Sequence, residues 1–282
     1  MTAVLALSAS LLWGVADFGG GVLARRLPAL TVVVVSQLMA AAVLLLAVLA
    51  TGSWTDASPA LWYAVAAGVI GPFAILAFYR ALALGPMGVV SPLTTVGIAV
   101  PVGVGLALGD RPGLPQLAGI AVALAGVVLA AGPERGGPTA ARKALLLTLG
   151  AAFGFGSCMA LIAHATTGGL LLALCVQRLC NVAVGGTTLL VTLRGARPAG
   201  LLPRLRAGLP ALTAVGLADV AANGVYALAS NGGSAAAAAV LASLYPVVTA
   251  LMARGVLKER LRPVQVVGAG LAVAGTLLLA AS

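Results

Sequence analysis

The stretch QLAGIAVALAG at residues 116–126 recurs as QVVGAGLAVAG at residues 265–275. Both copies begin with Gln and carry Gly at their fourth and last positions, and the shift is constant, since 265 − 116 and 275 − 126 both equal 149. The same shift places Asp110-Arg111 on Glu259-Arg260. The two halves of the chain are therefore related by an internal repeat.

Weaker matches extend the repeat toward the start of each half. Trp13-Gly14 corresponds to Phe155-Gly156, and the segment after Tyr79 resembles the segment after Tyr226. Gln37 occupies the position that corresponds to Arg178.

The composition is that of a membrane protein. Of the 282 residues, 61% are hydrophobic and 8% are charged, and the mean hydropathy is +1.14. Soluble domains carry about 25% charged residues. The net charge of +10 does not indicate nucleic-acid binding, because the basic residues fall in short gaps between apolar runs, where signals for membrane topology lie.

Ten apolar runs approach the roughly 20 residues that a helix needs to cross a bilayer. They are Ala3–Val22, Thr31–Ala50, Ala60–Leu82, Val89–Leu108, Leu114–Ala131, Ala144–Ala163, Gly169–Leu193, Ala207–Ala229, Ala235–Leu257 and Pro263–Ala281. The sequence thus predicts an all-α membrane protein of ten transmembrane helices. Five helices lie in a first repeat, residues 1–132, and five in a second, residues 144–282, joined by a basic cytoplasmic linker at residues 133–143.

Basic residues gather on one side of this arrangement. The loops after the first, fifth, seventh and ninth runs hold most of the 16 Lys and Arg residues, namely Arg25, Arg26, Arg135, Arg142, Lys143, Arg194, Arg197, Arg204, Arg206, Arg254, Lys258, Arg260 and Arg262. The positive-inside rule puts these loops in the cytoplasm and both termini outside. Because each repeat has an odd number of helices, the two repeats are predicted to be inverted relative to each other.

Apart from residues near the ends of the runs, such as Arg80, three charged residues lie clearly inside apolar runs, where each needs a structural or functional reason. They are Asp17, Arg178 and Asp219. Asp219 starts a polar stripe at helical spacing that continues with Asn223, Tyr226 and Ser230. This stripe is either a substrate or proton site, or a hydrogen-bonded seam to a neighbouring helix.

Arg178 lies near mid-membrane, with Gln177 and Asn181 beside it. If the seventh and eighth helices are antiparallel neighbours, Arg178 and Asp219 lie at similar depth. Two interpretations stay open at this point. The residues form a structural ion pair, or they open to bind a zwitterion, Arg178 taking a carboxylate and Asp219 an amine.

Asp17 follows Trp13 by one helical turn. A carboxyl group inside the membrane is a candidate proton carrier that exchanges protons for substrate. The structural alternative is an ion pair with Arg80. Among the scarce aromatic residues, Trp13, Tyr79, Tyr226 and Tyr245 are candidates for the wall of a substrate cavity.

Four motifs give the chain a family resemblance. They are LWG at residues 12–14, FYRAL at 78–82, LYPVV at 244–248 and KERL at 258–261. In these motifs and their order, the chain resembles the EamA-type ten-helix transporters of the drug/metabolite transporter superfamily. It departs from the family's pattern at Gly97, which stands opposite Pro246, at Asp110, where Glu is common, and at Asp17, where an uncharged polar residue is common.

The resemblance implies a secondary carrier for small metabolites such as amino acids, nucleosides or sugars. We expect export across the cytoplasmic membrane by alternating access, with protons as a candidate coupling ion. Substrate binding is assigned to Trp13, Tyr79, Arg178, Asn181, Asp219, Asn223, Tyr226 and Tyr245, and coupling to Asp17 and Asp219. A facilitative importer of the same fold remains an alternative.

Other functional classes fit the sequence less well. One His and no metal-ligand motif argue against metal chemistry, although an intramembrane aspartyl enzyme using Asp17 and Asp219 stays open. No phosphate-binding loop for ATP is present. We therefore expect no enzymatic activity, no cofactor and no metal, and as partners a small-molecule substrate and membrane lipid. Small residues serve packing within and between chains equally well, so no particular oligomeric state is predicted.

Overall fold

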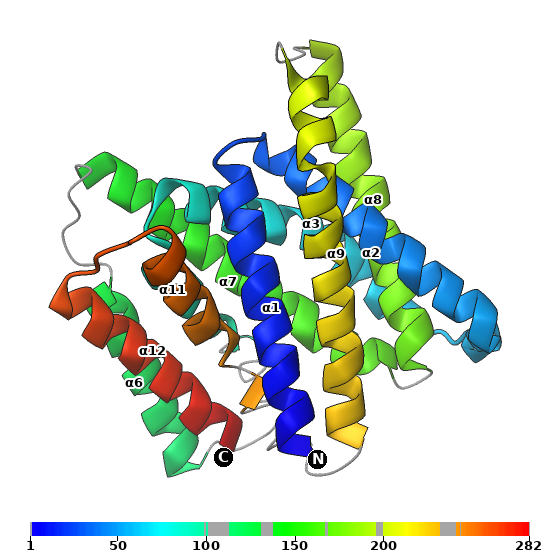
Figure 1. Ribbon diagram of the computed structural model, residues 1–282. Helices are drawn as coiled ribbons and strands as arrows, with labels where there is room; N and C mark the ends of the chain where they lie inside the picture. Colours follow the sequence, from blue (N-terminus) through cyan, green and yellow to red (C-terminus); the bar gives the residue numbers. More distant parts are fainter. Residues whose placement is uncertain are drawn as a thin grey trace.

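The fold is described from a computed structural model, which describes residues 2–98, 100, 113–130, 138–166, 169–195, 200–231, 241–242 and 244–281. Within these residues the secondary structure is helical (Figure 1). The α-helices are α1 (Thr2–Ala24), α2 (Ala29–Thr51), α3 (Leu61–Leu84), α4 (Met87–Thr94), α6 (Leu114–Ala130), α7 (Pro138–Ala165), α8 (Leu170–Gly195), α9 (Leu201–Asn231), α11 (Tyr245–Val256) and α12 (Pro263–Ala281). Short 3₁₀ helices cover Ser53–Asp56 and Thr95–Ile98.

Six of the described helices are long and apolar enough to cross a membrane, namely α1, α2, α3, α7, α8 and α9. The described parts of the other helices are shorter. The prediction of a multi-spanning all-α protein therefore holds, while the number of ten spans stays a prediction. Asp110, Arg111, Arg135 and Arg197 lie outside the described residues.

Two helices begin earlier than the apolar runs indicated. α7 begins at Pro138 and so includes residues 138–143, which we had assigned to the linker. Proline is favoured in the first turn, where its missing N–H would have no partner. α9 begins at Leu201 and carries Arg204 and Arg206 in its first turns. Hydropathy marks the membrane core, but a helix continues beyond it where long basic side chains reach water.

The helices bury small residues and expose large apolar ones. Ala6, Ala9 and Ala40 are fully buried, whereas the side chains of Leu46 and Phe153 are more than half exposed. Lipid solvates apolar side chains and gives no hydrophobic drive for helix association, so small residues that allow close approach form the contacts. This distribution is the one expected of helices in a bilayer.

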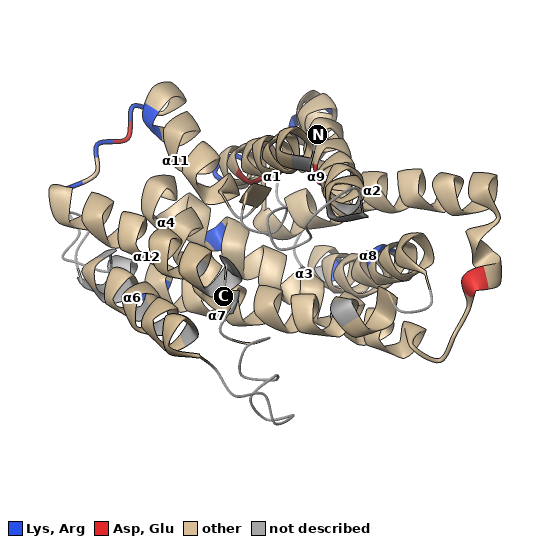
Figure 2. Cartoon of the chain, turned by 90° about the horizontal axis from the view of Figure 1, so that it is seen from below, with Lys and Arg blue, Asp and Glu red and all other residues tan. Residues whose placement is uncertain are grey.

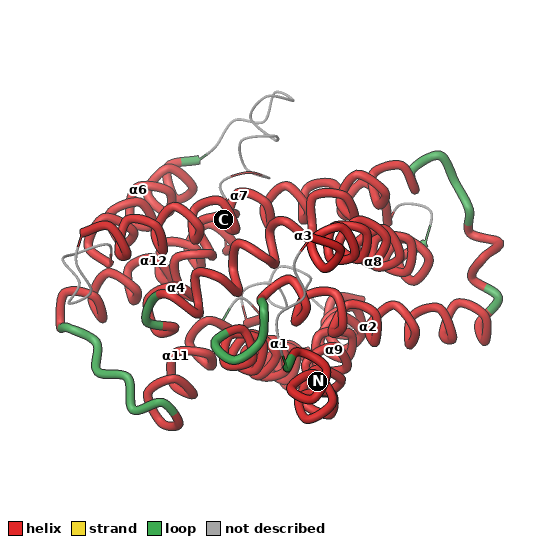
Figure 3. Tube along the Cα trace, turned by 90° about the horizontal axis from the view of Figure 1, so that it is seen from above, coloured by secondary structure: helices red, strands yellow, loops and turns green. Residues whose placement is uncertain are grey.

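The two halves pack through reciprocal contacts. α2 contacts α8, α4 contacts α11, and α6 contacts α12. The contact between α1 and α9 in turn corresponds, in the repeat, to the contact between α7 and α3. Figures 1 and 3 show α6 and α12 side by side at one edge and α2, α8 and α9 toward the other. In Figure 1 both chain termini lie at the same end of the bundle, opposite the connection between α1 and α2.

The α6–α12 contact carries the symmetry of the repeat in its backbone. A Cβ atom on Gly126 would meet Ala272 and Gly268, and one on Gly275 would meet Ala123 and Gly119. Shifting 119, 123 and 126 by 149 gives 268, 272 and 275, so the two sets of contacts are exchanged by the repeat. The stretches that revealed the repeat are thus the surfaces through which its halves meet.

This contact makes Gly275 a sensitive position. We expect Gly275→Ala to lower the free energy of unfolding by about 1–3 kcal/mol, because the new methyl group meets backbone atoms of α6 that cannot rotate away. Gly270→Ala on the same helix is the matched control, since its Cβ meets open space. Thermal unfolding in detergent compares them, and equal midpoints for the two variants would contradict the close helix packing.

Candidate functional site

A cavity of about 250 Å³ lies among α1, α2, α3, α7, α8, α9 and α11. Its polar wall is made by Asp17, Gln37, Gln177, Arg178, Asn181, Asp219 and Asn223. Its apolar wall includes Trp13, Phe78, Tyr79, Phe155, Cys158, Met159, Ile162, Leu174 and Tyr245. The cavity brings together the predicted site residues from five helices, with the exception of Tyr226.

The cavity extends toward one end of the bundle. Ile162 and Leu174 lie about one helical turn from the end of α7 and the start of α8, at the end that holds the N-terminus. At the other end a buried core that includes Leu27, Leu82 and Met87 separates the cavity from the connection between α1 and α2. The described lining of the cavity therefore extends further toward the end that carries the termini than toward the connection between α1 and α2.

The centre of the polar wall is an ion pair. Arg178 Nη2 lies 2.9 Å from Asp219 Oδ2, with the two side chains 10% and 21% exposed. Arg178 Nη1 also donates to Gln37 Oε1 at 2.6 Å. This ion pair is common to both interpretations of the two residues, the structural pair and the pair that opens to bind a zwitterion. Its other partner, Gln37, is the residue that corresponds to it in the repeat.

Asparagines flank both members of the pair. Asn181 Nδ2 donates to Gln37 Oε1 at 3.3 Å. Asn223 Nδ2 donates to the backbone oxygen of Asp219 at 2.6 Å. Within the described part of the chain, Arg178 Nε and Asn181 Oδ1 have no hydrogen-bond partner although both residues are buried. Both atoms are inaccessible to solvent, so a ligand in the cavity reaches them only after this part of the wall rearranges.

Asp17 faces the same cavity, and the described residues include no basic partner for it. It lies near enough to Asp219, Tyr79 and Tyr245 for electrostatic interaction. Among the described residues no ion pair joins it to Arg80, which is exposed, so the predicted Arg80 partner is wrong. The reason is helical geometry. Tyr79 packs on Gly20 of α1, and successive residues of a helix point about 100° apart, so Arg80 points away from α1.

The aromatic residues are arranged around Trp13. Its ring centroid lies 5.6 Å from that of Tyr226 and 6.2 Å from that of Tyr245. Trp13, Tyr79 and Tyr245 line the cavity, but Tyr226 packs with Ala6 and Ala229 behind Trp13. Tyr226 is thus next to the cavity wall through its ring contact with Trp13 but is not among the lining residues. The side chain of Ser230 lies outside the description.

Several lining residues were not predicted, although the repeat contains a signal for them. Trp13, Ala16 and Asp17 shifted by 142 become Phe155, Cys158 and Met159, and all of these line the cavity. The repeat also places uncharged Met159 opposite Asp17. The cavity is therefore assembled from corresponding helix faces but is chemically asymmetric.

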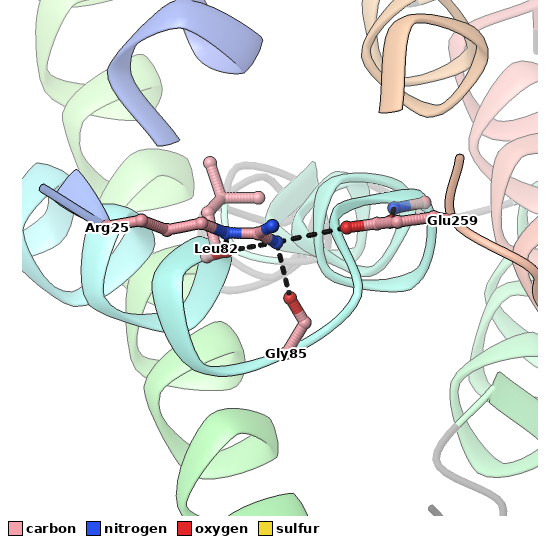
Figure 4. Close-up of polar contacts among 5 residues, drawn as sticks. Arg25, Leu82, Gly85 and Glu259 are labelled. Carbon is pink, nitrogen blue, oxygen red and sulfur yellow. Dashed lines mark hydrogen bonds and ion pairs between the residues drawn. The ribbon is translucent and has the colours of Figure 1, made fainter. Parts of the chain in front are cut away.

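A second ion pair connects the two halves outside the cavity. Arg25 Nη2 lies 3.0 Å from Glu259 Oε1, and the same guanidinium donates to the backbone oxygens of Leu82 and Gly85 (Figure 4). Glu259 Oε2 accepts from the backbone N–H of Gly88 at 3.3 Å. This Arg25–Glu259 bridge holds the connection after α1, the connection after α3 and the connection after α11 together.

The described residues contain no group of three or more His, Cys, Asp or Glu side chains that could hold a metal ion. The polar groups of the cavity are suited to binding a small charged or zwitterionic molecule and to holding a proton. They comprise a guanidinium, two carboxyl groups and several amides around a small space that aromatic rings partly enclose.

A bundle of apolar helices in two reciprocal halves, with an internal polar cavity, defines a multi-spanning membrane transport protein. The chain belongs to the EamA-like transporter family, whose profile matches residues 1–132 and again residues 142–281. This confirms the family resemblance. Among curated proteins, none matches significantly. A solved structure described as "Crystal structure of protein" has a TM-score of 0.62 and 18% identity, covering 98% of this chain and 95% of that one, and is similar in fold.

Proposed function

We propose that this protein is a secondary active transporter that exports small polar metabolites, such as amino acids or nucleosides, across the cytoplasmic membrane. The observation that carries the proposal is the polar cavity around the Arg178–Asp219 pair, at the junction of two repeat-related halves. Inverted repeats commonly hold the substrate near the midplane and give alternating access by moving against each other.

The charges suggest how a zwitterionic substrate is held. Its carboxylate takes the guanidinium of Arg178, and its amine takes Asp219, so that the substrate replaces the internal ion pair with two new ones. Because Arg178 and Asp219 neutralise each other before binding, neither of these two charges is left without a counter-charge when substrate is absent. Trp13 and Tyr245 enclose the remaining part of the substrate.

Asp17 supplies the coupling. It shares the cavity with Asp219 but has no basic partner among the described residues. Protonation of Asp17 removes negative charge next to the substrate's amine and so weakens the binding of the substrate. Binding of a proton and binding of substrate therefore oppose each other, and the two are exchanged. The aspartyl-enzyme alternative is disfavoured, because Asp219 is held by Arg178 and is not available to share a proton with Asp17.

The orientation follows from the basic loops. If they face the cytoplasm, the cavity is open to the outside, and the core around Leu82 together with the Arg25–Glu259 bridge closes the cytoplasmic side. Alternating access then requires this bridge to break when the cytoplasmic side opens.

Proteoliposomes containing a pH-sensitive dye test the proposal. We expect at least one pool of amino acids, nucleosides or sugars to move protons only when protein is present. Labelled substrate loaded on one side at a time distinguishes export from facilitative import. If no pool exchanges across the membrane, with or without proton movement, the proposal fails.

A further inference from the structure

A second cavity lies at the edge of the molecule, away from the first. It measures about 700 Å³ and lies among α4, α11, α12 and the connection between α11 and α12. Its lining includes Leu251, Arg254, Lys258, Glu259, Arg260 and Val266. Figure 2 shows charged residues gathered along this connection at the periphery of the bundle.

The cavity is strongly basic. Arg254, Lys258 and Arg260 are exposed, and none of them has an ion-pair partner among the described residues. Its one carboxylate, Glu259, is already occupied by Arg25 and by the N–H of Gly88. Three cations therefore remain available to an anion, with no local carboxylate free to neutralise them.

The backbone at Lys258 is unusual. Its φ is +54°, in the left-handed region where glycine is the favoured residue. The end of α11 determines this conformation, since the N–H groups of both Leu257 and Glu259 donate to the backbone oxygen of Ala253. A lysine thus stands at a position where glycine would fit with less strain.

The rest of the wall is apolar and continues onto exposed apolar side chains. Leu251 is 63% exposed and Val266 is 50% exposed, on the neighbouring helices α11 and α12. A free phosphate ion would use the cations but not this apolar wall. A ligand that uses both has an anionic head at the membrane surface and a hydrocarbon chain in the bilayer.

We propose that this cavity binds an anionic phospholipid, whose phosphate contacts Arg254, Lys258 and Arg260 and whose acyl chain lies along Leu251 and Val266. Basic pockets between helices near a membrane surface bind anionic headgroups in this way. The phosphate would lie beside the Arg25–Glu259 bridge, so the lipid supports the same end of the transporter that the bridge closes. This inference does not depend on the substrate or the direction of transport.

The experiment measures lipid binding to the purified full chain in detergent, by native mass spectrometry and thermal unfolding. Phosphatidylglycerol and phosphatidylcholine with identical acyl chains are compared, with inorganic phosphate and soluble glycerophosphoglycerol as chain-free probes. We expect phosphatidylglycerol to bind at least tenfold more tightly than phosphatidylcholine, and the chain-free probes not to compete at equal concentration.

Variants locate the site. The triple variant Arg254→Gln, Lys258→Gln, Arg260→Gln is expected to lose at least tenfold in phosphatidylglycerol affinity. The control Arg194→Gln, Arg204→Gln, Arg206→Gln removes the same charge from exposed residues of α8 and α9 and is expected to bind normally. Lys258→Gly removes one cation while suiting the positive φ, so it gives a folded variant with weakened lipid binding.

Three results would overturn the proposal. Equal binding of the two lipids would exclude headgroup recognition. Full competition by phosphate or glycerophosphoglycerol would make the cavity an anion site without a role for lipid. An equal loss of affinity in the Arg194, Arg204 and Arg206 control would mean that overall charge, not this cavity, attracts the lipid.

Discussion

An Arg178→Met variant is expected to lose transport and to unfold with a free energy about 3–5 kcal/mol lower than the wild type. Methionine is long and unbranched like the stem of arginine but has no charge, so Asp219 in the cavity wall loses the guanidinium that lies 2.9 Å away. It also removes the donor to Gln37. Thermal unfolding in detergent and flux in proteoliposomes measure the two effects separately.

The double variant Arg178→Met, Asp219→Leu separates stability from function. Replacing both members of a buried pair by apolar residues is often neutral, so we expect most of the stability to return while transport stays absent. Arg194→Met, at the exposed end of the same helix, is the control and should change neither property. Recovery of transport in the double variant would mean that the pair is only structural.

An Asp17→Asn variant is expected to abolish substrate-driven proton movement, with at least a tenfold fall in its rate, while exchange of labelled substrate continues. Asparagine keeps the size of the side chain but cannot carry the proton. Asp56→Asn, on an exposed connection outside the cavity, is the matched control and should behave as wild type.

Proton movement that persists at the wild-type rate in Asp17→Asn would exclude Asp17 as the coupling group. Loss of both proton movement and labelled exchange would instead make Asp17 part of the substrate site itself. The assay must therefore follow both quantities in the same preparation.

Much of the fold was predictable from local patterns. Apolar runs located the long helices because length and hydropathy together determine which segments cross a bilayer. The repeat at residues 116–126 and 265–275 went further, since these stretches turned out to pack on each other through Gly126 and Gly275. The early starts of α7 and α9 were not predicted, because hydropathy does not register a helix that continues into the polar interface.

The candidate site was predictable where polar residues stand out against an apolar background. Arg178, Asp219 and Asp17 were found for this reason, and they face one cavity. Contacts between helices were harder to predict, because they depend on how each helix is rotated about its own axis. Arg80 was wrongly paired with Asp17 although Tyr79, its neighbour, faces α1. The Arg25–Glu259 bridge joins residues far apart in sequence, and no local pattern indicates it.

In the proposed alternating access, one cavity opens to each side of the membrane in turn, and Cys158 in the cavity wall tests this without knowledge of the substrate. Cys175→Ser and Cys180→Ser leave Cys158 as the one thiol. A membrane-impermeant thiol reagent is applied from either side, with and without Glu259→Gln. We predict labelling of Cys158 from the side of the termini, and additional labelling from the side of the basic loops when Glu259→Gln weakens the bridge. Labelling from the basic-loop side alone, or a pattern that Glu259→Gln leaves unchanged, would contradict alternating access through this cavity.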